Sequence, residues 1–226
     1  MDDVKGIITD IQGFSTDNGP GIRTTVFLKG CALRCPWCHN PETLFPAPQL
    51  LFYPQRCLHC GRCVSRCPRH CHTDDESGHT FQRAVCTACG SCVSVCPAEA
   101  LVMAGKEIRV GEVMSRILAD LSGGGLSLSG GEPLLQADFC AELAKRCSFE
   151  GIRTLVDTSA CVPYSRFEAV RPYVREYYVD LKCPDEAAYR RHTGGSLITV
   201  LDNLVIGRRG GYYRPHSHHS TCQRHP

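Results

Sequence analysis

The sequence predicts an α/β fold that is interrupted by a cysteine-rich insert. After residue 105, patterns typical of helices alternate with short apolar strands, and alternation at this spacing predicts parallel βα units. From residue 46 to residue 105 the pattern changes to closely spaced cysteines. We therefore expect residues 1–45 to begin the α/β domain, residues 46–105 to form the insert, residues 106–213 to continue the domain, and residues 214–226 to be a tail.

The elements of the α/β domain follow from apolar spacing. Strands are expected near residues 6–12, 22–29, 126–129, 152–157 and 177–181. Helices are expected where apolar residues recur every three to four positions, namely at residues 110–121, 135–143, 167–174 and 197–205. Gly and Pro between the first two strands indicate a turn there.

Composition limits the function classes. The 226 residues carry a formal net charge of +2, so no global charge favours nucleic acid as a partner. There is no apolar run long enough for a bilayer and no leader pattern, which predicts a cytoplasmic protein without a membrane role. The tail from residue 214 contains histidines that could bind a metal, but an unstructured polar tail is the favoured interpretation.

Seventeen cysteines are the most unusual feature of the composition. Eleven of them form three tight clusters, which favours metal binding in a reducing compartment over a disulfide framework. The other six are expected to be buried or inert thiols: Cys71, Cys140, Cys147, Cys161, Cys183 and Cys222.

The first cluster is Cys31, Cys35 and Cys38, spaced Cys-x3-Cys-x2-Cys after the apolar run at residues 25–28. Three thiolates can hold three corners of a [4Fe-4S] cluster and leave the fourth iron without a protein ligand. An iron with a free position can bind a substrate or a cofactor, as an open catalytic metal site does.

The insert contains a repeated run, Cys-x2-Cys-x2-Cys-x3-Cys-Pro, that begins at Cys57 and again at Cys86. This is the bacterial ferredoxin run, in which the fourth cysteine binds the cluster of the other half. The first [4Fe-4S] cluster is therefore assigned to Cys57, Cys60, Cys63 and Cys96, and the second to Cys86, Cys89, Cys92 and Cys67. A pair of zinc sites is the alternative, but zinc needs neither the third cysteine nor the Cys-Pro ending.

Together with the surrounding residues, the first cluster resembles a known family. The three-cysteine pattern is similar to that of radical S-adenosylmethionine (SAM) enzymes, and the segments 17–24 and 38–42 resemble those of glycyl-radical-enzyme activases. The resemblance covers residues 4–207 and implies a partial (β/α) barrel with a two-cluster ferredoxin insert. Family members continue with further βα units, so the fold is expected to be incomplete at its C-terminus.

The resemblance implies the following activity. SAM bound to the open iron is reductively cleaved to methionine and a 5′-deoxyadenosyl radical, which abstracts a hydrogen atom from a backbone glycine of a partner glycyl radical enzyme. The cofactors are then SAM and three [4Fe-4S] clusters, with a monovalent cation as a further candidate. A flavodoxin or a ferredoxin-type protein would donate the electrons, and the two insert clusters would relay them.

The resemblance also implies site residues. Gly130, Gly131 and Glu132 match the family's Gly-Gly-Glu motif, which contacts the methionine part of SAM, although alone the motif is often a turn. Trp37 and His39, which flank Cys38, are expected beside the adenine. The strand-end residues Asp157, Asp180, Leu181 and Lys182 are expected beside the SAM carboxylate, the lysine as its ion pair and the aspartates near a cation or the substrate backbone. A helix cap is the alternative for Asp157.

Two other functions remain open from the sequence. One is a non-catalytic electron carrier, or an activase inactivated by truncation, in which only the ferredoxin module works. The other is a radical SAM enzyme that acts on a small molecule.

Overall fold

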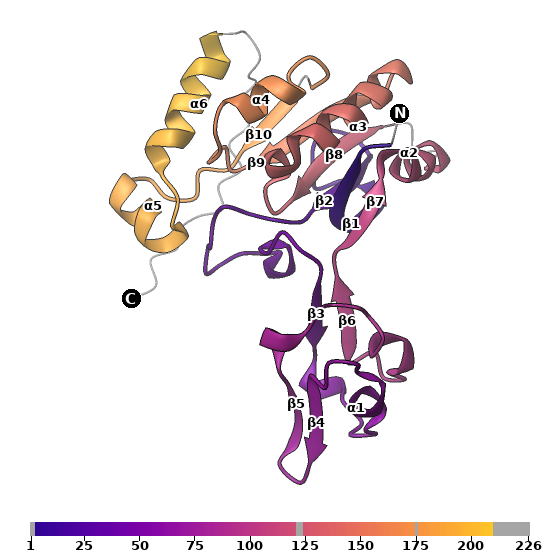
Figure 1. Ribbon diagram of the computed structural model, residues 1–226. Coiled ribbons are helices and arrows are strands. Elements are labelled where there is room, and N and C mark those ends of the chain that lie inside the picture. The colour runs from indigo at the N-terminus through magenta and orange to yellow at the C-terminus, as the bar shows by residue number, and fades with distance from the viewer. Residues whose placement is uncertain (1–2, 121–123, 175, 210–226) are drawn as a thin grey trace. The chain divides into compact units, whose positions relative to one another are not determined.

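A computed structural model describes residues 3–120, 124–174 and 176–209 (Figure 1). The chain divides into two compact units, which are described separately. One comprises the segments Met1–Pro46 and Glu107–Pro226, and the other is the segment Ala47–Lys106. The predicted tail at residues 214–226 lies outside the described residues.

The first unit is built on a six-stranded sheet with the strand order β10-β9-β8-β2-β1-β7. Its strands are β1 (Lys5–Ser15), β2 (Arg23–Leu28), β7 (Lys106–Arg109), β8 (Gly125–Gly130), β9 (Arg153–Thr158) and β10 (Glu176–Val179). Strand β1 is antiparallel to β2, while β2, β8, β9 and β10 are parallel neighbours in chain order. The predicted α/β class with parallel βα units is confirmed, and the carboxyl ends of four strands meet at one edge.

Helices lie between and after the parallel strands. They are α2 (Val110–Ala119), α3 (Ala137–Phe149), α4 (Ser165–Val170), α5 (Glu186–Thr193) and α6 (Leu197–Arg209), and a 3-10 turn, η5 (Pro133–Gln136), precedes α3. Apolar side chains of α2 and α3 share one core with the central strands, for example Val113, Phe139 and Leu128. Three of the four expected helices therefore lie close to their predicted positions, whereas α4 ends four residues before Val174.

Arg23 holds together the amino ends of the parallel strands. Its guanidinium is buried, and it donates to the hydroxyl of Ser127 (2.7 Å), to the carbonyl of Leu126 (2.8 Å) and to that of Arg153 (3.1 Å). These acceptors lie on β8 and β9, so a single side chain from β2 spans three strands. Arg23 thereby holds together the edge of the sheet formed by the amino ends of these strands.

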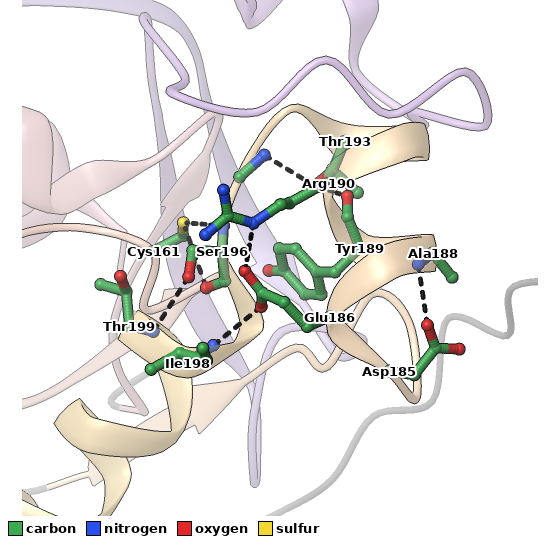
Figure 2. Close-up of polar contacts among 11 residues, drawn as sticks. Cys161, Asp185, Glu186, Ala188, Tyr189, Arg190, Thr193, Ser196, Ile198 and Thr199 are labelled. Atoms are coloured by element: carbon green, nitrogen blue, oxygen red, sulfur yellow. Dashed lines mark hydrogen bonds and ion pairs between the residues drawn. The ribbon is translucent and has the colours of Figure 1, made fainter.

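Polar contacts join helices α5 and α6 at a corner (Figure 2). Asp185 caps α5 by accepting from the backbone N–H of Ala188, and Glu186 accepts from both Arg190 and the backbone N–H of Ile198. At the end of α5, the carbonyl of Thr193 accepts from the backbone N–H of Arg34 (2.8 Å).

The second unit is small and contains two antiparallel hairpin-like pairs. Strand β3 (Gln49–Phe52) pairs with β6 (Leu101–Ala104), and β4 (His72–Asp75) pairs with β5 (Gly78–Phe81). One short helix, α1 (Arg62–Arg66), follows the first cysteines of the insert. Most of the remaining backbone is turns, which bring the cysteines of distant segments together.

Within the described part of the chain, no helix combines the length and the apolar character needed to cross a bilayer.

Candidate functional site

A cavity of about 640 Å³ opens at the carboxyl ends of the parallel strands. Ligand pockets commonly have volumes of roughly 300–1,000 Å³, and the carboxyl end of a parallel sheet is where α/β folds bind ligands. The cavity is lined by the three-cysteine segment, by Trp37 and His39, and by residues that follow β8, β9 and β10. Segments that are far apart in sequence therefore meet at one hollow of suitable size.

Cys31, Cys35 and Cys38 all line this cavity as free, partly exposed thiols. Backbone hydrogen bonds fix their segment at its start and in its middle: the N–H of Gly30 donates to the carbonyl of Thr43, and the N–H of Arg34 donates to the carbonyl of Thr193. The loop is thus held between the end of β2 and the end of α5, with its sulfur atoms directed to one space.

Burial makes the thiols of Cys31 and Cys35 poor acids in the absence of metal. Desolvation raises the pKa of Cys31 to about 11, and it also raises the pKa of Cys35, against the opposing effect of the nearby Lys182 ammonium. Metal ligands must be thiolates, so binding of iron at this loop releases protons. Three clustered, partly buried thiols are better suited to be the ligands of a metal cluster than to act as free nucleophiles.

Trp37 supplies an apolar surface with an unused donor. Its indole Nε1 is buried and has no hydrogen-bond partner among the described residues, and its ring lies 5.9 Å from that of His192. Indole nitrogens normally find an acceptor when they are buried. A bound ligand with acceptor atoms would meet this need. His39 lines the same cavity and is exposed.

Gly130 and Gly131 also line the cavity, but protein packing explains why they are glycines. A Cβ on Gly130 would lie 2.4 Å from the carbonyl oxygen of Leu28, and one on Gly131 would lie 2.3 Å from that of Gly30. Gly130 in addition has φ +114°. Both positions therefore require glycine because the backbones at the ends of β2 and β8 approach each other closely, whether or not a cofactor is bound.

Glu132, expected at the SAM site, is held by protein donors in the structure. Its carboxylate is fully buried and does not line the cavity. Four protein donors occupy it: the backbone N–H groups of Leu134 and Ser159, and the hydroxyls of Thr158 and Ser159. Burial raises its pKa, and these hydrogen bonds oppose the rise. Glu132 therefore ties the end of β8 to the end of β9, and the amino group of a ligand has no free access to it.

Asp157, Asp180 and Lys182 meet on the cavity wall, as their strand-end positions predict. The ammonium of Lys182 lies 2.6 Å from a carboxylate oxygen of Asp180. Asp157 accepts from the hydroxyl of Ser129 (2.8 Å). Burial, followed by the negative charge of Asp180, raises the pKa of Asp157 to about 6. Burial lowers the affinity of Lys182 for a proton, but Asp180 outweighs this and raises its pKa. Leu181, between them, is partly buried and packs against the core.

In the second unit the insert cysteines surround two small cavities. One is lined by Cys57, Cys60, Cys63 and Cys96, and the other by Cys67, Cys86, Cys89 and Cys92. Each cavity thus combines three cysteines of one run with the last cysteine of the other. Cys71, expected to be an isolated thiol, also lines the second cavity, and burial raises its pKa to about 12.

Two supporting residues escaped the sequence analysis. Lys29 is fully buried, and its ammonium donates to the carbonyl of Glu42, just beyond the cysteine loop. Ser129 lines the cavity and holds Asp157. Lys29 directly precedes the loop, but charged residues are rarely buried, so only its position could have indicated a structural role.

Comparison with known proteins identifies the family. A family model described as a 4Fe-4S single cluster domain matches residues 17–169. The chain is 42% identical to the indoleacetate decarboxylase activating enzyme of Tractidigestivibacter scatoligenes, over 91% of this chain and 70% of the relative. It is 44% identical to the benzylsuccinate synthase activating enzyme of Thauera aromatica, over 88% of this chain and 63% of the relative.

A third relative is the (2S)-3-sulfopropanediol dehydratase activating enzyme of Klebsiella oxytoca, which is 39% identical over 88% of this chain and 66% of the relative. The chain thus spans 63 to 70% of the length of these three relatives. The chain belongs to the radical SAM family of glycyl-radical-enzyme activating enzymes.

Proposed function

We propose that the chain activates a partner glycyl radical enzyme by reductive cleavage of SAM. The observation that carries this proposal is the single cavity shared by Cys31, Cys35 and Cys38 with the ion pair of Asp180 and Lys182. The three thiols are soft ligands that suit an iron-sulfur cluster, and the charged groups in the same cavity suit the amino and carboxylate groups of a ligand bound to that cluster.

The three cysteines would hold a [4Fe-4S] cluster, and the residues present fit that group. The loop offers three thiols to the cavity, which matches a cluster with one iron open. When the cluster and SAM are bound, one electron splits SAM into methionine and a 5′-deoxyadenosyl radical, which takes a hydrogen atom from a glycine and leaves a glycyl radical. The chain's own part is to bind, to orient and to exclude water.

Lys182 is the residue we assign to the SAM carboxylate. Its side chain is about one-fifth exposed, and its ammonium remains charged beside Asp180. Asp157 and Asp180 surround it with negative charge, so a monovalent cation could join them. Trp37 and His39 are the candidates for the adenine, because the indole Nε1 has no protein partner in the described chain. Gly130 and Gly131 complete the wall, and Leu181, which packs against the core, supports the segment between Asp180 and Lys182.

The insert would hold two further [4Fe-4S] clusters, one for each group of four cysteines. The division of cysteines between the two cavities supports this assignment, since each run gives its last cysteine to the other cavity. We propose that these clusters relay electrons from a flavodoxin or a ferredoxin-type donor to the SAM cluster. The described cysteines are free thiols, which fits a reducing compartment such as the cytoplasm.

The test is SAM cleavage by the reconstituted, reduced chain under anaerobic conditions. The parent should bind about twelve irons and release 5′-deoxyadenosine. Cys35→Ala should bind about four fewer irons and release none, whereas Cys161→Ala, a nearby thiol outside the trio, should behave like the parent. SAM cleavage unaffected by Cys35→Ala would refute the assignment.

The partner is tested separately. Indoleacetate decarboxylase and benzylsuccinate synthase, the enzymes served by two relatives, are suitable first candidates. After incubation with the chain and SAM, the correct partner should show a glycine-centred EPR doublet. Cleavage of SAM without this signal on any partner would favour a small-molecule substrate, and about eight irons without cleavage would favour an electron carrier.

A further inference from the structure

The two cysteine cavities of the insert differ in what surrounds their sulfur atoms. His79, on β5, lines the first cavity, with its Nδ1 3.5 Å from the Sγ of Cys57. His72, on β4, lines the second cavity. The two imidazoles contact each other, with Nδ1 of His72 3.1 Å from Nε2 of His79. A hydrogen-bonded pair of histidines therefore lies between the two cavities.

The cysteine sulfurs and His72 together determine which ring nitrogen of His79 carries the proton. A thiolate bound to iron has no proton and can only accept a hydrogen bond. Nδ1 of His79 lies 3.5 Å from the sulfur of Cys57 and its Nε2 lies 3.6 Å from the sulfur of Cys63, so a neutral His79 can donate to only one of these two thiolates. A proton on Nδ1 of His72 would be donated to Nε2 of His79 and would leave Nδ1–H of His79 to donate to Cys57, so His72 can set the tautomer of His79.

Ring contacts keep both imidazoles in place. The ring of Phe52 meets His79 edge-on at 4.4 Å, and the ring of Phe81 stacks on His72 at 5.0 Å. His72 is almost fully buried. At the second cavity the contacts found for the described residues are backbone N–H donors, from Cys71 to Cys67 and from Ala88 to Cys86, and the hydroxyl of Ser91, 3.4 Å from the sulfur of Cys89, with no imidazole bonded to a thiol.

We propose that His79, oriented by His72, donates a hydrogen bond to the Cys57 thiolate of the first insert cluster and raises the reduction potential of that cluster. The proposal rests on the two-cluster function proposed above for the insert. Hydrogen bonds to ligand sulfur stabilise the reduced, more negative cluster, and they are one of the means by which proteins set such potentials. The first cluster therefore accepts an electron more readily than it would without the imidazole.

The experiment is an EPR-monitored redox titration of the full chain in which Cys31, Cys35 and Cys38 are replaced by Ala, so that only the insert clusters contribute. With His79→Phe added, the ratio of reduced to oxidised first cluster at a fixed potential should fall about tenfold, which is a downward shift of 59 mV for a one-electron couple. The second cluster should be unchanged. Phe retains the ring packing against Phe52 but cannot donate.

Three further variants define the cause. His79→Gln restores a donor and should recover part of the shift. His72→Phe removes the group that sets the tautomer and should give a smaller shift in the same direction. Thr80→Val changes an exposed neighbour on the same strand, whose hydroxyl contacts Thr73, and should leave both potentials unchanged.

The outcomes distinguish failure of the proposed two-cluster insert from failure of the His79 hydrogen bond. If the parent insert binds no clusters, the proposed function of the insert fails and this inference with it. Both clusters formed, with the same potentials in parent and His79→Phe, would overturn the inference alone.

Two measurements on the unsubstituted insert keep the inference testable if His79→Phe does not assemble. With ¹⁵N-histidine, pulsed EPR should detect nitrogen coupled to one reduced cluster, and absence of this coupling would overturn the inference. Cys63, His72 and His79 also lie close enough together for a single metal ion. One stoichiometric zinc in place of four irons would likewise overturn it.

Discussion

Glu132 accepts hydrogen bonds from both the backbone N–H and the hydroxyl of Ser159, at 2.9 and 2.6 Å. With Thr158 and Leu134 bonded to its other oxygen, this carboxylate joins the ends of two neighbouring strands below the cavity floor. The Gly-Gly-Glu motif of this chain is thus explained by the architecture of the sheet. The alternative is that Glu132 contacts a ligand directly, and measurements of stability and of SAM binding can distinguish the two roles.

Replacement of Glu132 by Gln should destabilise the chain by about 1–3 kcal/mol. The amide NH2 must face either the N–H of Ser159 or that of Leu134, because both carboxylate oxygens accept from a backbone N–H, so one donor loses its partner. Urea unfolding of the reduced, cluster-free chain measures the loss. Ser159→Ala, which removes only the hydroxyl, should cost about 1 kcal/mol. Unchanged stability of Glu132→Gln with lost SAM binding would instead support direct contact.

Asp157→Asn should stabilise the chain above pH 6. The folded pKa of Asp157, about 6, is above its ordinary value of 3.8, so between these values the folded state binds more protons than the unfolded state. Stability contributed by this group therefore falls as pH rises from about 4 to about 6 and then stays constant. The Asn variant avoids this loss, which is roughly 3 kcal/mol at pH 8. It should lose SAM cleavage if the carboxylate acts in the site.

The measurement is the difference in unfolding free energy between Asp157→Asn and the parent at pH 5 and at pH 8. The difference should be larger at pH 8. Ser129→Ala is the matched control, because loss of the hydroxyl donor to Asp157 removes a group that lowers its pKa and should move the transition to higher pH. A difference that does not depend on pH would contradict this assignment.

The spacing of cysteines and of apolar residues along the sequence predicted much of the fold and of the site. The grouping of insert cysteines depends on a short repeat, and the strand ends that carry Asp157 and Lys182 follow from apolar runs in local sequence. Helix α5 was missed because only two of its eight residues, Tyr189 and Thr193, are buried, which is too few to give an apolar period. Burial of Arg23 and Lys29 and the inward direction of Glu132 depend on contacts between distant strands, which one sequence does not reveal.

Arg23→Met should destabilise the chain by roughly 2–4 kcal/mol, because the buried guanidinium donates hydrogen bonds to acceptors on two neighbouring strands. Removal of the guanidinium leaves carbonyl oxygens of Leu126 and Arg153 without their donor. Arg23→Lys should recover only part of this, since one ammonium cannot reach three strands. Urea unfolding gives both values. Arg153→Met, at an exposed side chain on the same edge, should change stability by less than about 0.5 kcal/mol.

Tyr189→Phe should stabilise the cluster-free chain by about 1 kcal/mol. Tyr189 is fully buried on α5, and its hydroxyl has no hydrogen-bond partner in the described part of the chain (Figure 2). Burial raises its pKa further, so the hydroxyl stays neutral and its desolvation is uncompensated. Urea unfolding of Tyr189→Phe and of Tyr164→Phe, whose hydroxyl is less buried, provides the comparison. A loss of stability in Tyr189→Phe would mean that the hydroxyl has an acceptor in the folded chain. A gain without clusters that becomes a loss once the clusters are bound would identify a cluster sulfur as that acceptor.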